Sequence, residues 1–238
     1  SALGELPPVD YAVHSDTTHE AAGTYAHAKK WTPWLEEHGV KVVTVTANRP
    51  DVVREDWSNS VLIPAFTVSK IGNPGQVKRQ CTHDWKIMPI RRFLRSVTKA
   101  TPGAVQLWQG ISFDEWQRMR SSDVAYIENV YPLVDRRITR EGCVAWLQAH
   151  DLEAPPKSAC VFCPFTSIGS WKRLKQEGGP DWEKALEVDA AIRHKRPGFV
   201  LGVHPARIPL AEAVHIPEDD GAHQMELDMP CDGGTCFV

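Results

Sequence analysis

The opening residues alternate a strand pattern, a helix pattern and a second strand pattern. Residues 9–16 form a short apolar run that ends in polar side chains, helical character extends from Thr17 to about His38, and Lys41 to Thr46 is rich in β-branched residues. A strand, a helix and a strand in so short a stretch form a βαβ unit, which requires parallel strands and a right-handed crossover. We therefore expect an α/β fold with a parallel sheet, and a ligand crevice beyond the carboxyl ends of its strands.

The rest of the chain predicts further elements and three parts. Helices are expected at 89–99, 114–121, 139–151 and within 167–195, and a core strand is expected at 105–110. Residues 48–76 contain many prolines and glycines and are expected to be loops. We predict an α/β domain over 1–135, a helical cysteine-rich part over 136–197, and a loosely structured tail or lid over 198–238.

Composition restricts the cellular compartment and the classes of partner that we expect for the chain. It has 238 residues, 42% of them hydrophobic, and a net charge of −3, which gives no global field for nucleic acid or acidic membranes. No apolar run approaches the roughly 18–20 residues of a membrane span. Residues 1–5 lack the basic and apolar regions of a signal peptide. The sequence predicts a cytoplasmic protein without a membrane partner.

The arrangement of the six cysteines points to metal chemistry. Cys160-Val-Phe-Cys163 places two thiols on one tight turn, and Cys143 and Cys81 precede it. In a reducing compartment such a group more often binds a metal than forms disulfides. From spacing alone, zinc and an iron–sulfur cluster remain equal alternatives. Cys81 and Cys143 can also be small core residues.

Three further features are candidates for binding or catalysis. Asp16 and Glu20, at a strand end, suit ribose hydroxyls or a metal-bound nucleotide, although a strand-end aspartate can also cap a helix. The basic stretch 78–99, with Trp85 and Phe93 interleaved, suits nucleic-acid or nucleotide phosphates, or is a solvated helix face. Cys231 and Cys236 flank a Gly-Gly pair near the chain end and suit mobile catalytic thiols, or are a disulfide or free thiols of a tail.

The chain resembles the phosphoadenosine phosphosulfate reductase-like family of the PP-loop (adenine-nucleotide alpha hydrolase) superfamily, in its cluster-bearing branch. The resemblance covers roughly residues 9–195, in order and spacing. Its motifs are Asp16-Thr17-Thr18-His19-Glu20, similar to D-T-G-x-E; Cys81-Thr-His-Asp-Trp-Lys86-Ile-Met-Pro89, similar to C-T/C-x-x-x-K-x-x-P; Gly110-Ile-Ser with Asp114-Glu115 and Arg118; Tyr131-Pro-Leu-Val-Asp135 with Ile138 to Cys143; and Pro156 to Phe165.

The resemblance implies a Rossmann-like PP-loop domain that uses ATP or a related adenine nucleotide with Mg²⁺. It implies a 4Fe–4S cluster on Cys81, Cys143, Cys160 and Cys163, with zinc as the alternative. It further implies Lys86 beside the cluster and the anionic substrate, and Asp16, Thr17, Glu20 and Gly110 on the nucleotide side. The family's phosphate loop, S-G-G-x-D-S, belongs before the Asp16 strand and is absent from this sequence; we expect it to precede Ser1.

These observations predict an iron–sulfur enzyme of sulfur chemistry that uses an adenine nucleotide to thiolate or otherwise modify a nucleic-acid or nucleotide target. A sulfur-donor protein is a further expected partner. Two alternatives stay open. One is a phosphoadenylyl-sulfate reductase that uses the tail thiols Cys231 and Cys236 catalytically. The other is a non-catalytic binding module, stabilised by a cluster or zinc, that lacks the phosphate loop.

Overall fold

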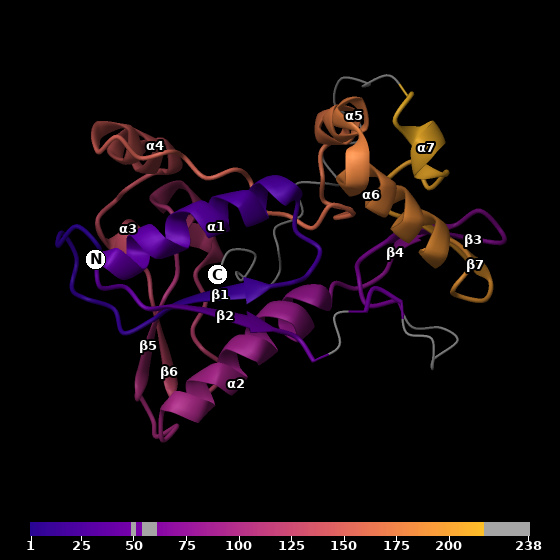
Figure 1. Ribbon diagram of the computed structural model, residues 1–238. Helices are drawn as coiled ribbons and strands as arrows, with labels where there is room; N and C mark the ends of the chain where they lie inside the picture. Colours follow the sequence, from indigo (N-terminus) through magenta and orange to yellow (C-terminus); the bar gives the residue numbers. More distant parts are fainter. Residues whose placement is uncertain (49–50, 54–60, 217–238) are drawn as a thin grey trace.

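The computed structural model describes residues 1–48, 51–53 and 61–216, and it confirms the predicted βαβ unit (Figure 1). Strand β1 (Ala12–Asp16), helix α1 (Ala22–Glu37) and strand β2 (Val42–Thr46) follow one another, and the two strands pair in parallel. Their register sets Ala12 opposite Val42 and Asp16 opposite Thr46. Both strands therefore end at the same edge, where the polar residues after Ser15 begin.

A second parallel pair comes from the middle of the chain. Strands β5 (Val105–Trp108) and β6 (Ile127–Val130) are connected through the short 3₁₀ helix η2 (Phe113–Arg118). Among the described residues no strand hydrogen bonds link this pair to β1 and β2. Helix α2 (Met88–Val97) covers both pairs instead, because Ile90 and Leu94 form one apolar cluster to which both pairs contribute side chains, namely Val13, Val45, Val105, Leu107 and Ile127.

The third sheet is antiparallel and lies in a separate region with helices α5 (Ile168–Glu177), α6 (Gly179–Ile192) and α7 (Leu210–Ala213) (Figure 1). Its strand order is β4 (Pro74–Gln76), β3 (Phe66–Ser69) and β7 (Phe199–Gly202). Strand β3 pairs with β7 across more than half of the chain. Residues expected to be loop (48–76) and tail (198–216) thus contain strands whose partners are distant in sequence.

The helices of the cysteine-rich part agree with expectation. Helix α4 (Arg140–Ala149) begins after Thr139, whose hydroxyl accepts a hydrogen bond of 3.1 Å from the Gly142 amide. Helix α3 (Pro132–Asp135) precedes it. The predicted helix near 114–121 is only the short η2. Within the described residues, no helix has the length and apolar character that crossing a bilayer requires. The fold is a mixed α/β structure with small parallel sheets.

The main core lies between the antiparallel sheet, α5 and α6. Trp85, Phe162 and Trp171 are almost completely buried there, with exposures of 1%, 1% and 0%. Trp85 belongs to a single π-helical turn, η1 (His83–Ile87), and Phe162 lies inside the Cys160–Cys163 turn. The core therefore holds two of the predicted functional segments directly, and Cys81 and Cys160 pack against its edge.

Asp189 connects three elements of this region. The carboxylate of this α6 residue is 3% exposed and accepts hydrogen bonds from the amides of Val203, at 2.9 Å, and Leu210, at 3.0 Å. It also forms an ion pair with Arg193 one helical turn further on. A buried carboxylate is tolerated only with such partners, so Asp189 fixes β7 and α7 against α6.

We expect Asp189→Ala to lower the free energy of unfolding by roughly 3–5 kcal/mol, because it leaves two amides and a nearly buried guanidinium without their acceptor. Urea denaturation at constant m-value measures the change. Glu183→Ala, an exposed position on the same helix, is the matched control and should change stability by no more than about 0.5 kcal/mol. Equal stabilities of the two variants would contradict this role of Asp189.

Candidate functional site

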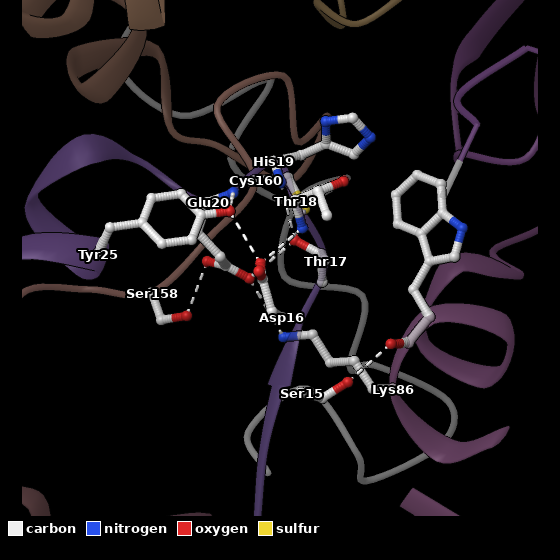
Figure 2. A network of polar contacts seen from close by, with 11 residues as sticks. Ser15, Asp16, Thr17, Thr18, His19, Glu20, Tyr25, Lys86, Ser158 and Cys160 are labelled. Atoms are coloured by element: carbon white, nitrogen blue, oxygen red, sulfur yellow. Dashed lines mark hydrogen bonds and ion pairs between the residues drawn. The ribbon is translucent and has the colours of Figure 1, made fainter. Parts of the chain in front are cut away.

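The end of β1 turns sharply, and Asp16 holds the turn. One oxygen of its carboxylate, Oδ1, accepts hydrogen bonds from the Thr18 amide, at 2.7 Å, and from the Tyr25 hydroxyl, at 2.9 Å (Figure 2). Thr18 has a φ of 62°, a conformation that is strained for a β-branched residue. Burial, followed by the hydrogen bond to Asp16, raises the pKa of Tyr25, so this hydroxyl stays protonated. Both of these hydrogen bonds use Oδ1, so among the described residues the turn leaves the second carboxylate oxygen of Asp16 available to a ligand.

Glu20 is the most buried acidic group of the strand end, at 5% exposure. Its Oε1 accepts a hydrogen bond of 3.3 Å from the Thr17 hydroxyl, and its Oε2 accepts one of 2.9 Å from the Ser158 hydroxyl. The Lys86 ammonium lies 3.7 Å from Oε1, with a side-chain exposure of 15%. These three partners come from three separate segments, and they compensate the loss of hydration that a buried carboxylate suffers.

The cysteine turn packs against the same strand end. The Cys163 amide donates to the Cys160 carbonyl at 2.9 Å, which closes the turn, and the Val161 amide donates to the His19 carbonyl at 2.9 Å. Glu20 and Cys160 form an isolated antiparallel bridge. The Thr17 hydroxyl and the Cys160 sulfur are 3.5 Å apart and share a hydrogen bond. The two predicted sites, strand end and cysteine turn, are therefore adjacent (Figure 2).

Three of the four predicted ligand cysteines, Cys81, Cys160 and Cys163, lie near enough to affect one another's pKa. Burial is the main reason that the pKa of Cys160 is raised to about 12; the hydrogen bond with Thr17 opposes the rise, and the neighbouring Glu20, Cys163 and Cys81 contribute to it. Burial also raises the pKa of the Cys163 thiol, which Cys81 influences too. Cys81 lies two residues before η1 and packs against the same core as Cys160. Among the described residues, no three His, Cys, Asp or Glu side chains are close enough to bind one metal ion without a shift.

Cys143 is not brought to this group. It lies on α4, in the wall of a mostly apolar cavity of about 550 Å³ between α4, α1 and the first residues of the chain. Burial raises its pKa, as does the nearby Asp114, whereas Arg140 opposes them. The tryptophans of this cavity wall are Trp31, Trp34 and Trp146.

The positive charges around the thiols differ from those expected. Lys86 pairs with Glu20, as described above, whereas Arg79 and Lys157 are the cations that lower the pKa of Cys163. Lys157 and the Glu20 partner Ser158 lie directly before the cysteine turn, and that proximity in sequence could have identified both. Tyr25 had no such signal, because its contact with Asp16 depends on the first turn of α1.

Two other predictions have separate outcomes. Gly110 follows β5, is exposed, and would meet no atom within 4 Å if it carried a Cβ, so its surroundings do not require glycine. Cys231 and Cys236 lie outside the described residues. The basic stretch 78–99 is not one continuous face: Lys86 contacts Glu20, Arg91 contacts Asp123, and Arg92 donates to the Asn48 side chain at 2.8 Å.

Aromatic packing fixes the relative positions of the three segments of the site, which are the β1 turn, η1 and the cysteine turn. The His19 ring lies 5.3 Å from the Trp85 ring and 5.0 Å from the Phe162 ring, measured between centroids. Ser15 donates a hydrogen bond of 2.7 Å to the Trp85 carbonyl, which ties β1 to η1.

No family model, curated protein or solved structure matches the chain. The chemistry of the site is therefore argued from its residues and from the sequence resemblance.

We expect Lys86→Met to lower the free energy of unfolding by roughly 3 kcal/mol, the lower end for a broken buried pair, since it leaves the Glu20 carboxylate without its cation. Adding Glu20→Gln should restore much of that loss, because the neutral amide needs no counter-ion. Urea unfolding of the two single variants and the double variant gives the coupling energy.

The exposed pair Lys184–Glu187, with side-chain exposures of 41% and 68%, supplies the matched control. Lys184→Met should cost no more than about 1 kcal/mol. Additive effects of Lys86→Met and Glu20→Gln would show that the two side chains do not interact.

Proposed function

We propose that this chain is an enzyme of sulfur chemistry in which an adenine nucleotide, bound at the end of β1, lies beside a cysteine-bound metal centre. The observation that carries the proposal is the contact between the two halves of the site. The Thr17 hydroxyl bonds Glu20 on one side and the Cys160 sulfur on the other. Neither the polar groups at the strand end nor the thiols indicate a function on their own. Because one hydroxyl contacts both, we treat them as one site.

The strand end supports a nucleotide on chemical grounds. Ligands of parallel α/β sheets bind beyond the carboxyl ends of strands, where Asp16, Thr17 and Glu20 lie. Carboxylate oxygens accept hydrogen bonds from ribose hydroxyls and bind Mg²⁺. Asp16 is suited to this because the hydrogen bonds from Thr18 and Tyr25 both use its Oδ1, which leaves Oδ2 to face a ligand. Glu20 is already saturated by Thr17, Ser158 and Lys86, so we assign it the role of positioning the cysteine turn.

The thiols support a metal centre, with Cys81, Cys160 and Cys163 as its ligands. The fit is incomplete as the chain stands, because the three thiols need a shift to converge on one ion. Burial raises the pKa of Cys163, and Arg79 and Lys157 oppose this rise; a bound metal would replace the thiol proton, because thiolates are the species that bind zinc or iron. A 4Fe–4S cluster on these residues would bind or orient the sulfur that is transferred. Participation of Cys143 would require α4 to move from its cavity.

The residues around the thiols then have separate tasks. The Thr17 hydroxyl contacts Cys160 at 3.5 Å and thereby fixes the side of the sulfur that faces the strand end. Val161 and Phe162, the next two residues of the cysteine turn, are buried at 7% and 1% exposure and anchor the turn in the apolar core. Lys86 neutralises Glu20, so that the strand end does not repel an incoming anionic nucleotide as strongly as two bare carboxylates would.

We expect anaerobically reconstituted protein to bind iron with broad absorbance near 400 nm, and Cys160→Ser to lose that iron. The physical reason is that Cys160 is central to the thiol group, whereas Cys143 lies elsewhere. Cys143→Ser is therefore the matched control and should retain the iron of the unsubstituted protein. Iron and zinc per chain, measured by inductively coupled plasma mass spectrometry, report the result.

Loss of iron from Cys143→Ser would show that all four cysteines bind, as the resemblance implies, and that α4 moves. Stoichiometric zinc, with no iron after reconstitution, would replace the cluster by a structural zinc site. Metal retention in Cys160→Ser would refute the metal centre proposed at this turn.

The nucleotide half of the site is tested by Asp16→Asn. The amide oxygen of asparagine can keep the hydrogen bonds from Thr18 and Tyr25, so the turn persists while the charge is lost. We expect the dissociation constant for Mg²⁺–ATP, measured by isothermal titration calorimetry on the full protein, to rise roughly tenfold or more, as hydrogen bonds to charged groups predict. Unchanged affinity would mean that Asp16 only caps the turn.

A further inference from the structure

A second cavity, distinct from the thiol site, has a basic lining. It measures about 260 Å³ and lies between α2, the β5–β6 pair and residues 118–123. Four basic side chains line it, and Asp123 is the carboxylate among its lining residues; the basic residues are His83, Arg91, Arg118 and Arg120. Three guanidinium groups around one small cavity make an environment suited to an anion.

The arginines of the cavity are held in place by the protein. Arg91 forms an ion pair with Asp123, and Arg118 forms one of 2.6 Å with Glu115. Arg120 donates to the carbonyls of Gln117, at 2.8 Å, and Met119, at 2.7 Å. Because the side chains are already ordered, an incoming anion loses little binding free energy to their immobilisation.

The lining of the cavity also includes a neutral side-chain amide, that of Gln109. Gln109 follows β5 and is buried, with an exposure of 5%. Its backbone amide donates to the Val130 carbonyl at 2.9 Å. Among the described residues no hydrogen bond is made by its side-chain amide, although that residue lines the cavity. In the part of the chain that the structure describes, the amide lies at the cavity without a competing protein partner, so it can donate a hydrogen bond to a bound anion.

The negative charge of Asp123 lowers the affinity of the cavity for an anion, so removing that charge should raise the affinity. The hydrogen bond from Arg91 lowers the pKa of Asp123, so its carboxylate is ionised near neutral pH. Its side chain is 74% exposed, whereas that of Arg91 is 16% exposed. Removing the carboxylate charge would free the Arg91 guanidinium for a ligand, which would then replace Asp123 as the partner of this largely buried group.

We propose that this cavity binds the phosphate group of a nucleotide unit, with Arg91, Arg120 and Gln109 as its donors. A tetrahedral anion accepts hydrogen bonds in several directions at once, which matches planar guanidinium groups together with an amide. The volume lies below the roughly 300–1,000 Å³ of pockets that enclose whole ligands, so the cavity accommodates one charged group and leaves the attached nucleoside outside. The inference does not depend on the metal centre or on Asp16.

The experiment measures the binding of three probes to the full protein by isothermal titration calorimetry at low ionic strength: inorganic phosphate, AMP and a single-stranded oligonucleotide. We expect Arg120→Gln to weaken all three roughly tenfold, since it removes a charge-assisted hydrogen bond. Gln109→Leu should weaken them several-fold, and Asp123→Asn should strengthen them. Arg120 is exposed, so its substitution does not endanger the fold.

Arg92→Gln is the matched control, because Arg92 neighbours Arg91 on α2 but does not line the cavity. It should leave the three affinities within about twofold. The source of the phosphate follows from the probes: an oligonucleotide bound at least tenfold more tightly than AMP indicates a polynucleotide, and similar affinities indicate a mononucleotide.

Equal weakening by Arg92→Gln and Arg120→Gln would overturn the proposal, since general positive charge would then explain the binding. So would an Asp123→Asn variant that binds no more tightly than the unsubstituted protein. Loss of phosphate binding with intact iron content, or the reverse, separates this inference from the proposed metal centre.

Discussion

A single buried carboxylate decides how the segments of this protein meet. Glu20 cannot be removed from water without donors and a cation around it, and it obtains them from the β1 turn, from η1 and from the segment before the cysteine turn. These segments are far apart in sequence. The chain can therefore bury Glu20 only by assembling the site, so the stability of the fold and the geometry of the site depend on the same contacts.

Apolar packing supplies the precision that one ion pair cannot. Phe162 and Trp85 are buried in the main core, and both rings contact His19. Close-packed interiors tolerate little displacement of such large side chains. The thiols at the edge of this core are therefore held in place by apolar neighbours. Asp189 stabilises another part of the same core through its hydrogen bonds to the residues after β7 and at the start of α7.

Local patterns in the sequence predicted the βαβ unit, α2 and α4, because strand alternation, helical periodicity and the Thr139 cap are encoded within a few residues. They also placed Asp16, Glu20 and the Cys160–Cys163 turn among the site residues. They missed the strands β3 and β7, whose pairing joins distant segments. The spacing of the cysteines likewise cannot show that Cys143 lies in another cavity, since that depends on how α4 packs against α1.

The arrangement of helix α2 over two separate parallel pairs has a consequence for how the molecule opens. Strand hydrogen bonds are directional, but the contacts of Ile90 and Leu94 with both pairs are not. Among the described residues, no ladder obliges β1–β2 and β5–β6 to separate together. Native-state hydrogen exchange should then resolve two cooperative units, each with its own opening free energy, that share α2. Helix α2 thus packs against two units at once, and the backbone amides of β1–β2 and of β5–β6 report separately on the opening of each.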